Sequence, residues 1–70
     1  MTISEKIRLL ARRRGFTVTG LAAAIGMTRQ NLSIKLRHNN FTTKELNKIA
    51  AVLNCRFETD FIMNDTGERI

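Results

Sequence analysis

Five side chains between positions 28 and 37 carry groups that can recognise a hydrogen-bonding surface. They supply two guanidiniums, a carboxamide, a hydroxyl and one apolar group, in Arg29, Gln30, Ser33, Ile34 and Arg37. Leu32 and Leu36, at positions i and i+4, form the opposite edge of a predicted helix, so the five side chains point outward. Such groups on the exposed front of a short helix are suited to reading base edges in a DNA major groove.

Two short helices joined at a glycine are predicted to position this edge. The first, over 18–25, has an apolar edge at helical spacing, formed by Leu21, Ala22 and Ile25. Gly26 permits the left-handed conformation that ends a helix abruptly. Thr17 is suited to cap the first helix and Thr28 to cap the second, over 28–37. The pattern therefore predicts a helix, a tight turn and a second, outward-facing helix.

Two further helices are predicted on either side of this pair. The spacing of a capping box occurs at Thr2 with Glu5 and again at Thr42 with Glu45. The helix that begins near Ile3 has a buried stripe of Ile3, Ile7, Leu10 and Ala11, and the last helix has one of Leu46, Ile49, Ala50 and Leu53. Gly15 and Asn54 can take the left-handed positions that end these two helices. The sequence thus predicts a mainly α, four-helix domain.

Residues 55–70 follow a different pattern. The alternation of Phe57, Thr59, Phe61 and Met63 with charged residues is typical of a half-buried strand over 56–63. Residues 64–67 are typical of a hairpin loop, and 68–70 of a short return arm. A lone strand leaves backbone groups unpaired, so it needs a partner from the return arm or from a second copy of the protein. We favour a homodimer formed through residues 56–63.

Positive charge is concentrated in one part of the chain. The net charge is +6, with eight basic residues and one acidic residue over 1–40 (8 − 1 = +7) and four basic against five acidic over 41–70 (4 − 5 = −1). A polyanionic partner explains this asymmetry better than solubility, which favours an even spread. Arg12, Arg13 and Arg14 lie in the last turn of the first helix, where the helix dipole favours them. A phosphate contact by these arginines is a second, compatible role.

The sequence shows no constellation typical of an enzyme. Its single histidine, His38, and single cysteine, Cys55, lie far apart, and it has no glycine-rich phosphate loop and no motif-placed pair of carboxylates. We therefore expect no catalysis, no metal, no cofactor and no small-molecule ligand. No apolar run is long enough to cross a membrane and no signal-peptide pattern is present, so we expect a cytoplasmic protein.

The run from Leu21 to Leu36 resembles the helix-turn-helix of the Xre/Cro group, the lambda-repressor-like regulators of bacteria and phages. The shared features are an alanine after the first apolar residue, a glycine in the turn, and Thr-Arg-Gln at the start of the second helix. The resemblance implies a lambda-repressor-like helix-turn-helix DNA-binding domain over 1–54. It also implies that 55–70 is a strand or hairpin extension of the same compact unit and a dimerisation arm, because some small Cro proteins dimerise through appended strands.

The outward edge and the resemblance together predict a sequence-specific regulator of transcription that binds double-stranded DNA, most simply a repressor. The residues expected to face the bases are Thr28, Arg29, Gln30, Ser33 and Ile34. Those expected to contact phosphates are Thr17, Arg37, Asn39, Asn40 and Lys44. Val18 stands where the family often has a phosphate-binding glutamine, which leaves that contact to Thr17 or to a backbone N–H.

Two alternatives remain open at this point. Asn39 and Asn40 are equally suited to forming a plain turn. The whole domain is also compatible with a protein-interaction module of the same fold, such as an antitoxin-like or antirepressor-like partner binder. The charge asymmetry favours DNA over that second possibility.

Overall fold

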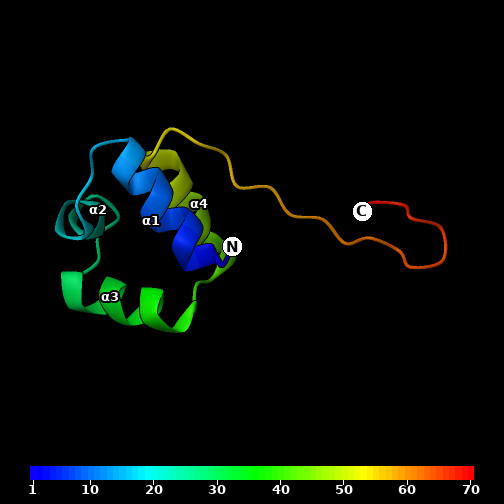
Figure 1. Cartoon of the computed structure of the whole chain (residues 1–70), viewed down its shortest axis with the longest axis horizontal. Helices are drawn as coiled ribbons and strands as arrows, with labels where there is room; N and C mark the ends of the chain where they lie inside the picture. The colour runs from blue at the N-terminus through cyan, green and yellow to red at the C-terminus, as the bar shows by residue number, and fades with distance from the viewer.

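A computed structural model describes residues 1–70 as four packed helices followed by an extended tail (Figure 1). The helices are α1 (Ile3–Arg13), α2 (Val18–Ala24), α3 (Arg29–His38) and α4 (Thr43–Val52). The tail, residues 55–70, leaves the end of α4 and gives the molecule extents of 44 × 23 × 20 Å. The predicted mainly α, four-helix architecture is confirmed. None of the helices combines the length and apolar content needed to cross a membrane.

Each helix begins at a threonine that caps it. The hydroxyl oxygens accept the backbone N–H three residues later at 3.0–3.1 Å, in Thr2, Thr17, Thr28 and Thr42. Glu5 and Glu45 complete two capping boxes, because their carboxylates accept the backbone N–H groups of Thr2 at 3.1 Å and Thr42 at 2.8 Å. These local bonds satisfy N–H groups that have no partner inside the helix, which explains why sequence spacing located the helix starts.

Each helix ends at a residue with positive φ. These residues are Gly15 after α1, Gly26 after α2, Asn39 after α3 and Asn54 after α4. At the end of α2, the N–H of Gly26 donates to the carbonyl of Ala23 at 3.2 Å and that of Met27 to Ala22 at 2.8 Å. This pair of bonds turns the chain sharply, so that α3 begins within a few residues.

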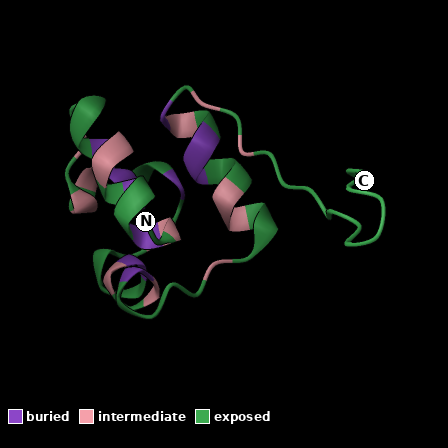
Figure 2. Ribbon diagram, turned by 45° about the vertical axis from the view of Figure 1, so that its right-hand side comes forward, coloured by how far each residue is buried: buried purple, intermediate pink, exposed green.

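The core is built from one apolar edge of every helix (Figure 2). Its buried members are Ile7, Ala11, Leu21, Ala22, Ile25, Leu32, Leu36, Ile49 and Leu53. Leu21, Leu32 and Leu53 are at most 1% exposed. Most of the tail, by contrast, is exposed along its length in Figure 2. Helix packing therefore depends on a small cluster in which each leucine contributes substantially.

Polar bonds fasten α1 at both of its ends. Ser4, near the start of α1, is buried; its hydroxyl donates to the Leu36 carbonyl, and its backbone N–H donates to the side-chain oxygen of Asn39 at 2.9 Å. At the other end, Nε of Arg14 donates to the Leu53 carbonyl at 2.9 Å. One end of α1 is thus held to the end of α3 and the other to the end of α4.

The tail differs from the predicted strand over 56–63. Backbone hydrogen bonds of 2.8–3.0 Å pair Phe61 with Ile70 and join Met63 to Glu68 and Gly67. A short hairpin therefore forms within the chain, closed by the predicted loop over 64–67. Residues 56–60 form no such backbone hydrogen bond. The sequence also predicts that 55–70 belongs to the same compact unit, whereas this segment projects away from the helices in Figure 1.

The two capping-box carboxylates make folding stability sensitive to acid. The hydrogen bond from the Thr2 backbone lowers the pKa of Glu5 below its usual 4.5, and the Thr42 backbone and then Lys35 do the same for Glu45. Because the unfolded carboxylates take up protons first, stability is present above about pH 4.5 and is lost as the pH falls through the lowered folded-state pKa. We expect the thermal midpoint, followed by circular dichroism, to drop between about pH 5 and pH 3.

A pair of variants isolates this effect. Glu45→Gln should flatten the dependence of the midpoint on pH, because one of the two titrating groups is removed. Glu58→Gln should leave it unchanged, because Glu58 lies on the exposed tail in a loose 3.8 Å contact with Arg56. If the thermal midpoint changes with pH equally in Glu45→Gln and in the unmodified protein, Glu45 is not a source of the acid sensitivity.

Candidate nucleic-acid interface

The turn at Gly26 brings α2 and α3 against each other (Figure 1). Leu32 and Leu36 of α3 are buried in the same core cluster as the apolar edge of α2. Because both leucines lie on one face of α3, burying them fixes how that helix is rotated about its own axis. The outward face of α3 is therefore determined by the core.

The face of α3 opposite its leucines carries polar side chains and one exposed isoleucine. Gln30, Ile34 and Arg37 follow the spacing i, i+4, i+7, which places them in a row along this face. All three are exposed, Ile34 to 42%. Arg29 is exposed beside this row, and Ser33 is half-buried. The five side chains expected to point outward therefore share one continuous surface.

Several of these groups are free to bind a ligand. Arg29, Gln30 and Arg37 form no side-chain hydrogen bond or ion pair within the chain, as the protein's three ion pairs all lie elsewhere. The Thr28 hydroxyl accepts the backbone N–H of Asn31 at 3.1 Å, which leaves its proton to donate. The surface thus offers unsatisfied donors and acceptors, as recognition of base edges requires.

Sequence reasoning missed Asn31. Its side chain is exposed near the start of α3, three residues before Ile34 and so on a neighbouring part of the same surface. The signal for Asn31 in the sequence is its spacing, because position 31 lies three residues before Ile34 in a helix that begins after Thr28. Its carboxamide adds one more hydrogen-bonding group to the outward face.

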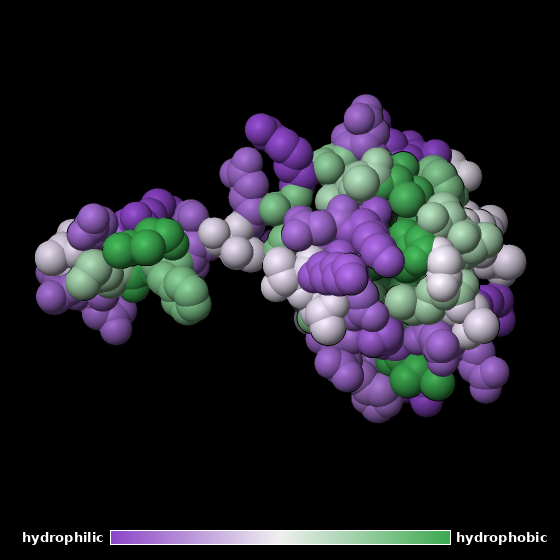
Figure 3. All heavy atoms as spheres, turned by 180° about the vertical axis from the view of Figure 1, so that it is seen from behind, coloured by the Kyte–Doolittle hydropathy of each residue, from purple (hydrophilic) through white to green (hydrophobic).

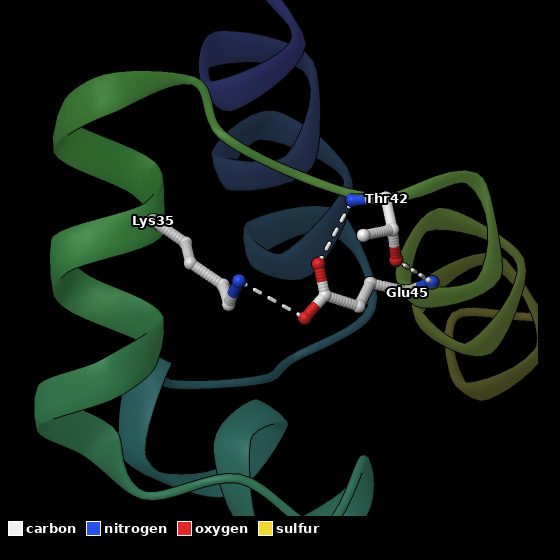
Figure 4. Close-up of polar contacts among 3 residues, drawn as sticks. All are labelled: Lys35, Thr42 and Glu45. Carbon is white, nitrogen blue, oxygen red and sulfur yellow. Dashed lines mark hydrogen bonds and ion pairs between the residues drawn. The ribbon is translucent and has the colours of Figure 1, made fainter.

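An ion pair holds α3 to α4. Nζ of Lys35 lies 3.1 Å from the carboxylate of Glu45, which also accepts the backbone N–H of Thr42 (Figure 4). The side chains of Lys35 and Glu45 are only 28% and 21% exposed. Lys35 is therefore occupied within the protein, and the pair supports the orientation of α3 instead of contacting a ligand.

The five residues predicted to contact phosphates are all exposed, namely Thr17, Arg37, Asn39, Asn40 and Lys44. Asn39 has a left-handed backbone with φ of 51°, and its side-chain oxygen is occupied by the N–H of Ser4. Only its amide NH₂ group remains free. The backbone N–H of Asn40 donates to the Lys35 carbonyl at 3.0 Å, so both asparagines form the turn that ends α3.

A family model for the Cro/C1-type HTH DNA-binding domain matches residues 6–64 of the chain. The chain belongs to this family. The match runs from within α1 to the start of the hairpin loop, and it confirms the resemblance to the Xre/Cro group. It identifies this Cro/C1-type domain as a DNA-binding regulator. Comparison with curated proteins and with solved structures found no match.

Six of the eight basic residues over 1–40 of this Cro/C1-type domain form two groups. Arg29, Lys35 and Arg37 lie on α3, whereas Arg12, Arg13 and Arg14 lie at the end of α1 that faces away from α3 in Figure 1. Arg14 is bonded to the last turn of α4, which shows a structural role for it. The charge of the first forty residues is thus not all presented on the helix-turn-helix surface.

No group of three or more His, Cys, Asp or Glu side chains suited to a metal ion is present in the Cro/C1-type domain. His38, at the end of α3, is exposed, and Cys55, at the start of the tail, is half-buried. The recognisable chemistry of this surface is hydrogen bonding and charge.

Proposed function

We propose that this Cro/C1-type domain is a sequence-specific repressor that inserts α3 into the major groove of double-stranded DNA. The observation that supports this is the row of exposed, unpaired groups on α3, opposite two leucines that fix the helix in the core. A major groove about 12 Å wide admits one α-helix. The N-terminal half of α3 would then lie closest to the base edges.

Each outward residue has a base-pair feature that it can recognise. Arg29 can donate two hydrogen bonds to a guanine, and Gln30 can pair with the edge of an adenine. Ile34 can pack on the methyl group of a thymine. Thr28 and Ser33 can each hydrogen-bond either kind of base, because a hydroxyl both donates and accepts.

Contacts to the DNA backbone set the register of α3. Arg37 and Lys44 supply positive charge, and Asn40 supplies a carboxamide. Asn39 contributes through its free amide NH₂, and Thr17 through its hydroxyl proton or a neighbouring backbone N–H. These contacts are common to all sequences, so they add affinity without choosing the operator.

The repressor acts in the cytoplasm as a homodimer on a two-fold symmetric operator. Two copies of α3 placed about 34 Å apart would enter successive major grooves on one side of the duplex. The operator would then be a palindrome with half-sites one helical turn apart. A dimer bound in this way represses transcription by covering a promoter.

Removing the Arg29 side chain tests the proposed base readout. We expect Arg29→Ala to cost roughly 1–3 kcal/mol on the specific site while binding to unrelated duplexes barely changes. The operator is first obtained by selection from random duplexes, and affinities are then measured by fluorescence anisotropy at constant salt.

Arg13→Ala is the matched control, because it removes the same charge from an exposed arginine at the end of α1 that faces away from α3. It should leave the ratio of specific to non-specific affinity unchanged. If Arg29→Ala weakens both kinds of binding equally, Arg29 contacts a phosphate and the readout is assigned wrongly.

A further inference from the structure

The start of α1 lies against the end of α3, and each supplies hydrogen bonds that the other lacks (Figure 1). The first backbone N–H groups of an α-helix and its last carbonyls have no partner within that helix. At the start of α1, the backbone N–H of Ser4 donates to the side-chain oxygen of Asn39 at 2.9 Å. At the end of α3, the carbonyl of Leu36 accepts the hydroxyl of Ser4. Ser4 therefore forms both bonds between the two helices.

Burial favours both bonds of Ser4. It is 6% exposed and is the one buried polar residue of the chain. Breaking either bond would leave a buried polar group unpaired, which costs free energy comparable to a lost hydrogen bond. The backbone of Asn39 is held as well, because its N–H donates to the carbonyl of Lys35 and its φ is 51°. Asn39 thus has one fixed backbone and one fixed carboxamide oxygen.

The backbone of Ser4 decides which atoms of the Asn39 carboxamide are left for a ligand. A backbone N–H only donates, so the atom that it contacts is the carboxamide oxygen and not the nitrogen. The NH₂ group is then turned away from Ser4. It donates to no other group of the chain, and Asn39 is exposed. Asn39 therefore presents two donor hydrogens to solvent in one orientation.

We propose that Ser4 is a positioning residue for DNA binding, whose backbone N–H fixes the Asn39 carboxamide so that the NH₂ group donates to a phosphate. The proposal rests on the DNA-binding function proposed above and adds the start of α1 to the residues that act in it. Ser4 itself does not touch the DNA. An NH₂ group only donates and a phosphate oxygen only accepts, so the orientation that Ser4 imposes suits this contact.

The place of Asn39 favours a phosphate over a base. Asn39 follows the last residue of α3 and lies ten positions after Arg29, which is about 15 Å further along the helix axis. Base edges are contacted by the N-terminal residues of a recognition helix. In Figure 3, which shows the molecule from behind, the lower part of the helical unit, where α3 lies, is mostly hydrophilic. The end of α3 is therefore suited to the sugar-phosphate backbone beside the groove.

A donor that is already fixed differs from a long cationic side chain in two ways. Ordering a flexible side chain on binding costs conformational entropy, and a side chain held in the free protein does not lose that entropy again. The NH₂ group is also neutral, so it displaces no counterion from the DNA. Its contribution to affinity should therefore stay constant as salt rises, whereas those of Arg37 and Lys44 should fall.

Asn39→Asp tests the contact with phosphate. It keeps an oxygen for the Ser4 N–H but replaces the NH₂ group with a second, negatively charged oxygen. Aspartate also visits the left-handed conformation, so folding should be retained. Asn54→Asp is the matched control, because Asn54 is exposed, has φ of 56°, and follows the Leu53 carbonyl that Arg14 bonds at the end of α1 away from α3.

Affinity for a labelled duplex of unrelated sequence is measured by fluorescence anisotropy, because a phosphate contact needs no operator. We expect Asn39→Asp to weaken binding at least about tenfold more than Asn54→Asp, because a hydrogen bond to a charged group is replaced by repulsion. Circular dichroism should show that both variants are folded. Equal losses for the two variants would show that Asn39 does not face a phosphate. A loss seen only with the selected operator would place Asn39 at a base. Either result overturns the proposal.

Ser4→Pro and Ser4→Ala test the positioning itself. Both remove the hydroxyl, but only proline also removes the backbone N–H, and the first turn of a helix tolerates proline. We expect Ser4→Pro to bind the unrelated duplex several-fold more weakly than Ser4→Ala, with the same slope of log K against log salt, because the donor that loses its orientation is neutral. Affinities are compared per folded molecule. Equal affinities, or a changed slope, would overturn the role of Ser4.

Nuclear magnetic resonance tests the same role without a variant. In ¹⁵N,¹³C-labelled protein, a scalar coupling across the hydrogen bond should join the backbone nitrogen of Ser4 to the side-chain carbonyl carbon of Asn39. On adding the unrelated duplex, the NH₂ resonances of Asn39 should shift and those of Asn54 should not. A missing coupling in the free protein, or equal shifts at the two asparagines, would overturn the proposal even if Ser4→Pro does not fold.

The unmodified protein separates this proposal from the function on which it rests. If it shows no salt-sensitive binding to duplex DNA, the repressor is refuted and the role of Ser4 with it. If it binds and Asn39→Asp behaves like Asn54→Asp, only the role of Ser4 and Asn39 is refuted, and the repressor stands.

Discussion

Raising the salt concentration from about 50 to about 200 mM is expected to weaken binding to duplex DNA by roughly a hundredfold. Each chain brings two cationic side chains to the proposed phosphate contacts: Arg37 and Lys44. A dimer therefore displaces counterions from about four phosphates, which predicts a slope of about −4 for log K against log salt. The measurement is a series of anisotropy titrations with a labelled duplex at several salt concentrations.

Two variants locate the source of this slope. Lys44→Ala should reduce it by about two in a dimer, because one phosphate contact is lost from each chain. Arg13→Ala should change it little, since the end of α1 lies away from α3. If log K does not change with log salt, binding to duplex DNA has no electrostatic basis.

Leu32→Ala is expected to have the largest effect on folding. The Leu32 side chain is fully buried, at 0% exposure, where it joins α3 to the rest of the core. Truncating a buried leucine to alanine costs about 2–5 kcal/mol. A single core in a domain of this size supplies only about 3–5 kcal/mol, so much of the variant should be unfolded at 37 °C. Urea denaturation followed by circular dichroism measures the loss.

Ile34→Ala is the matched control on the same helix. Ile34 is only two residues away but 42% exposed, so its truncation should change the free energy of unfolding by well under 1 kcal/mol. It should instead lower affinity for an operator whose thymine it contacts. If both variants destabilise the domain equally, the rotation of α3 described here is wrong.

The helical part of the fold follows from short-range signals. The four capping threonines and the positive-φ positions at Gly15, Gly26 and Asn54 placed helix ends to within about a residue. These signals are local, because each cap bonds a backbone group only three residues away. The outward face of α3 could be predicted equally well, since Leu32 and Leu36 define it by their spacing alone.

Contacts between residues that are distant in the sequence could not be predicted from it. The bond from Ser4 to Asn39 spans 35 positions, and nothing in the local sequence marks Ser4 as buried. The ion pair between Lys35 and Glu45 likewise depends on how α3 crosses α4. The alternation over 56–63 indicated extended backbone, but it did not specify whether that backbone has a partner along its whole length.

Hydrogen bonds join both ends of α1 to other helices. Ser4 ties one end of α1 to the end of α3, and Arg14 ties the other end to Leu53, immediately before the tail departs. The end of α3 and the start of the tail are therefore connected by α1, a rigid helix about 16 Å long. In a homodimer formed through the tail, the linker over 56–60 would set the distance between the two α3 helices, and the length of that linker would select the half-site spacing.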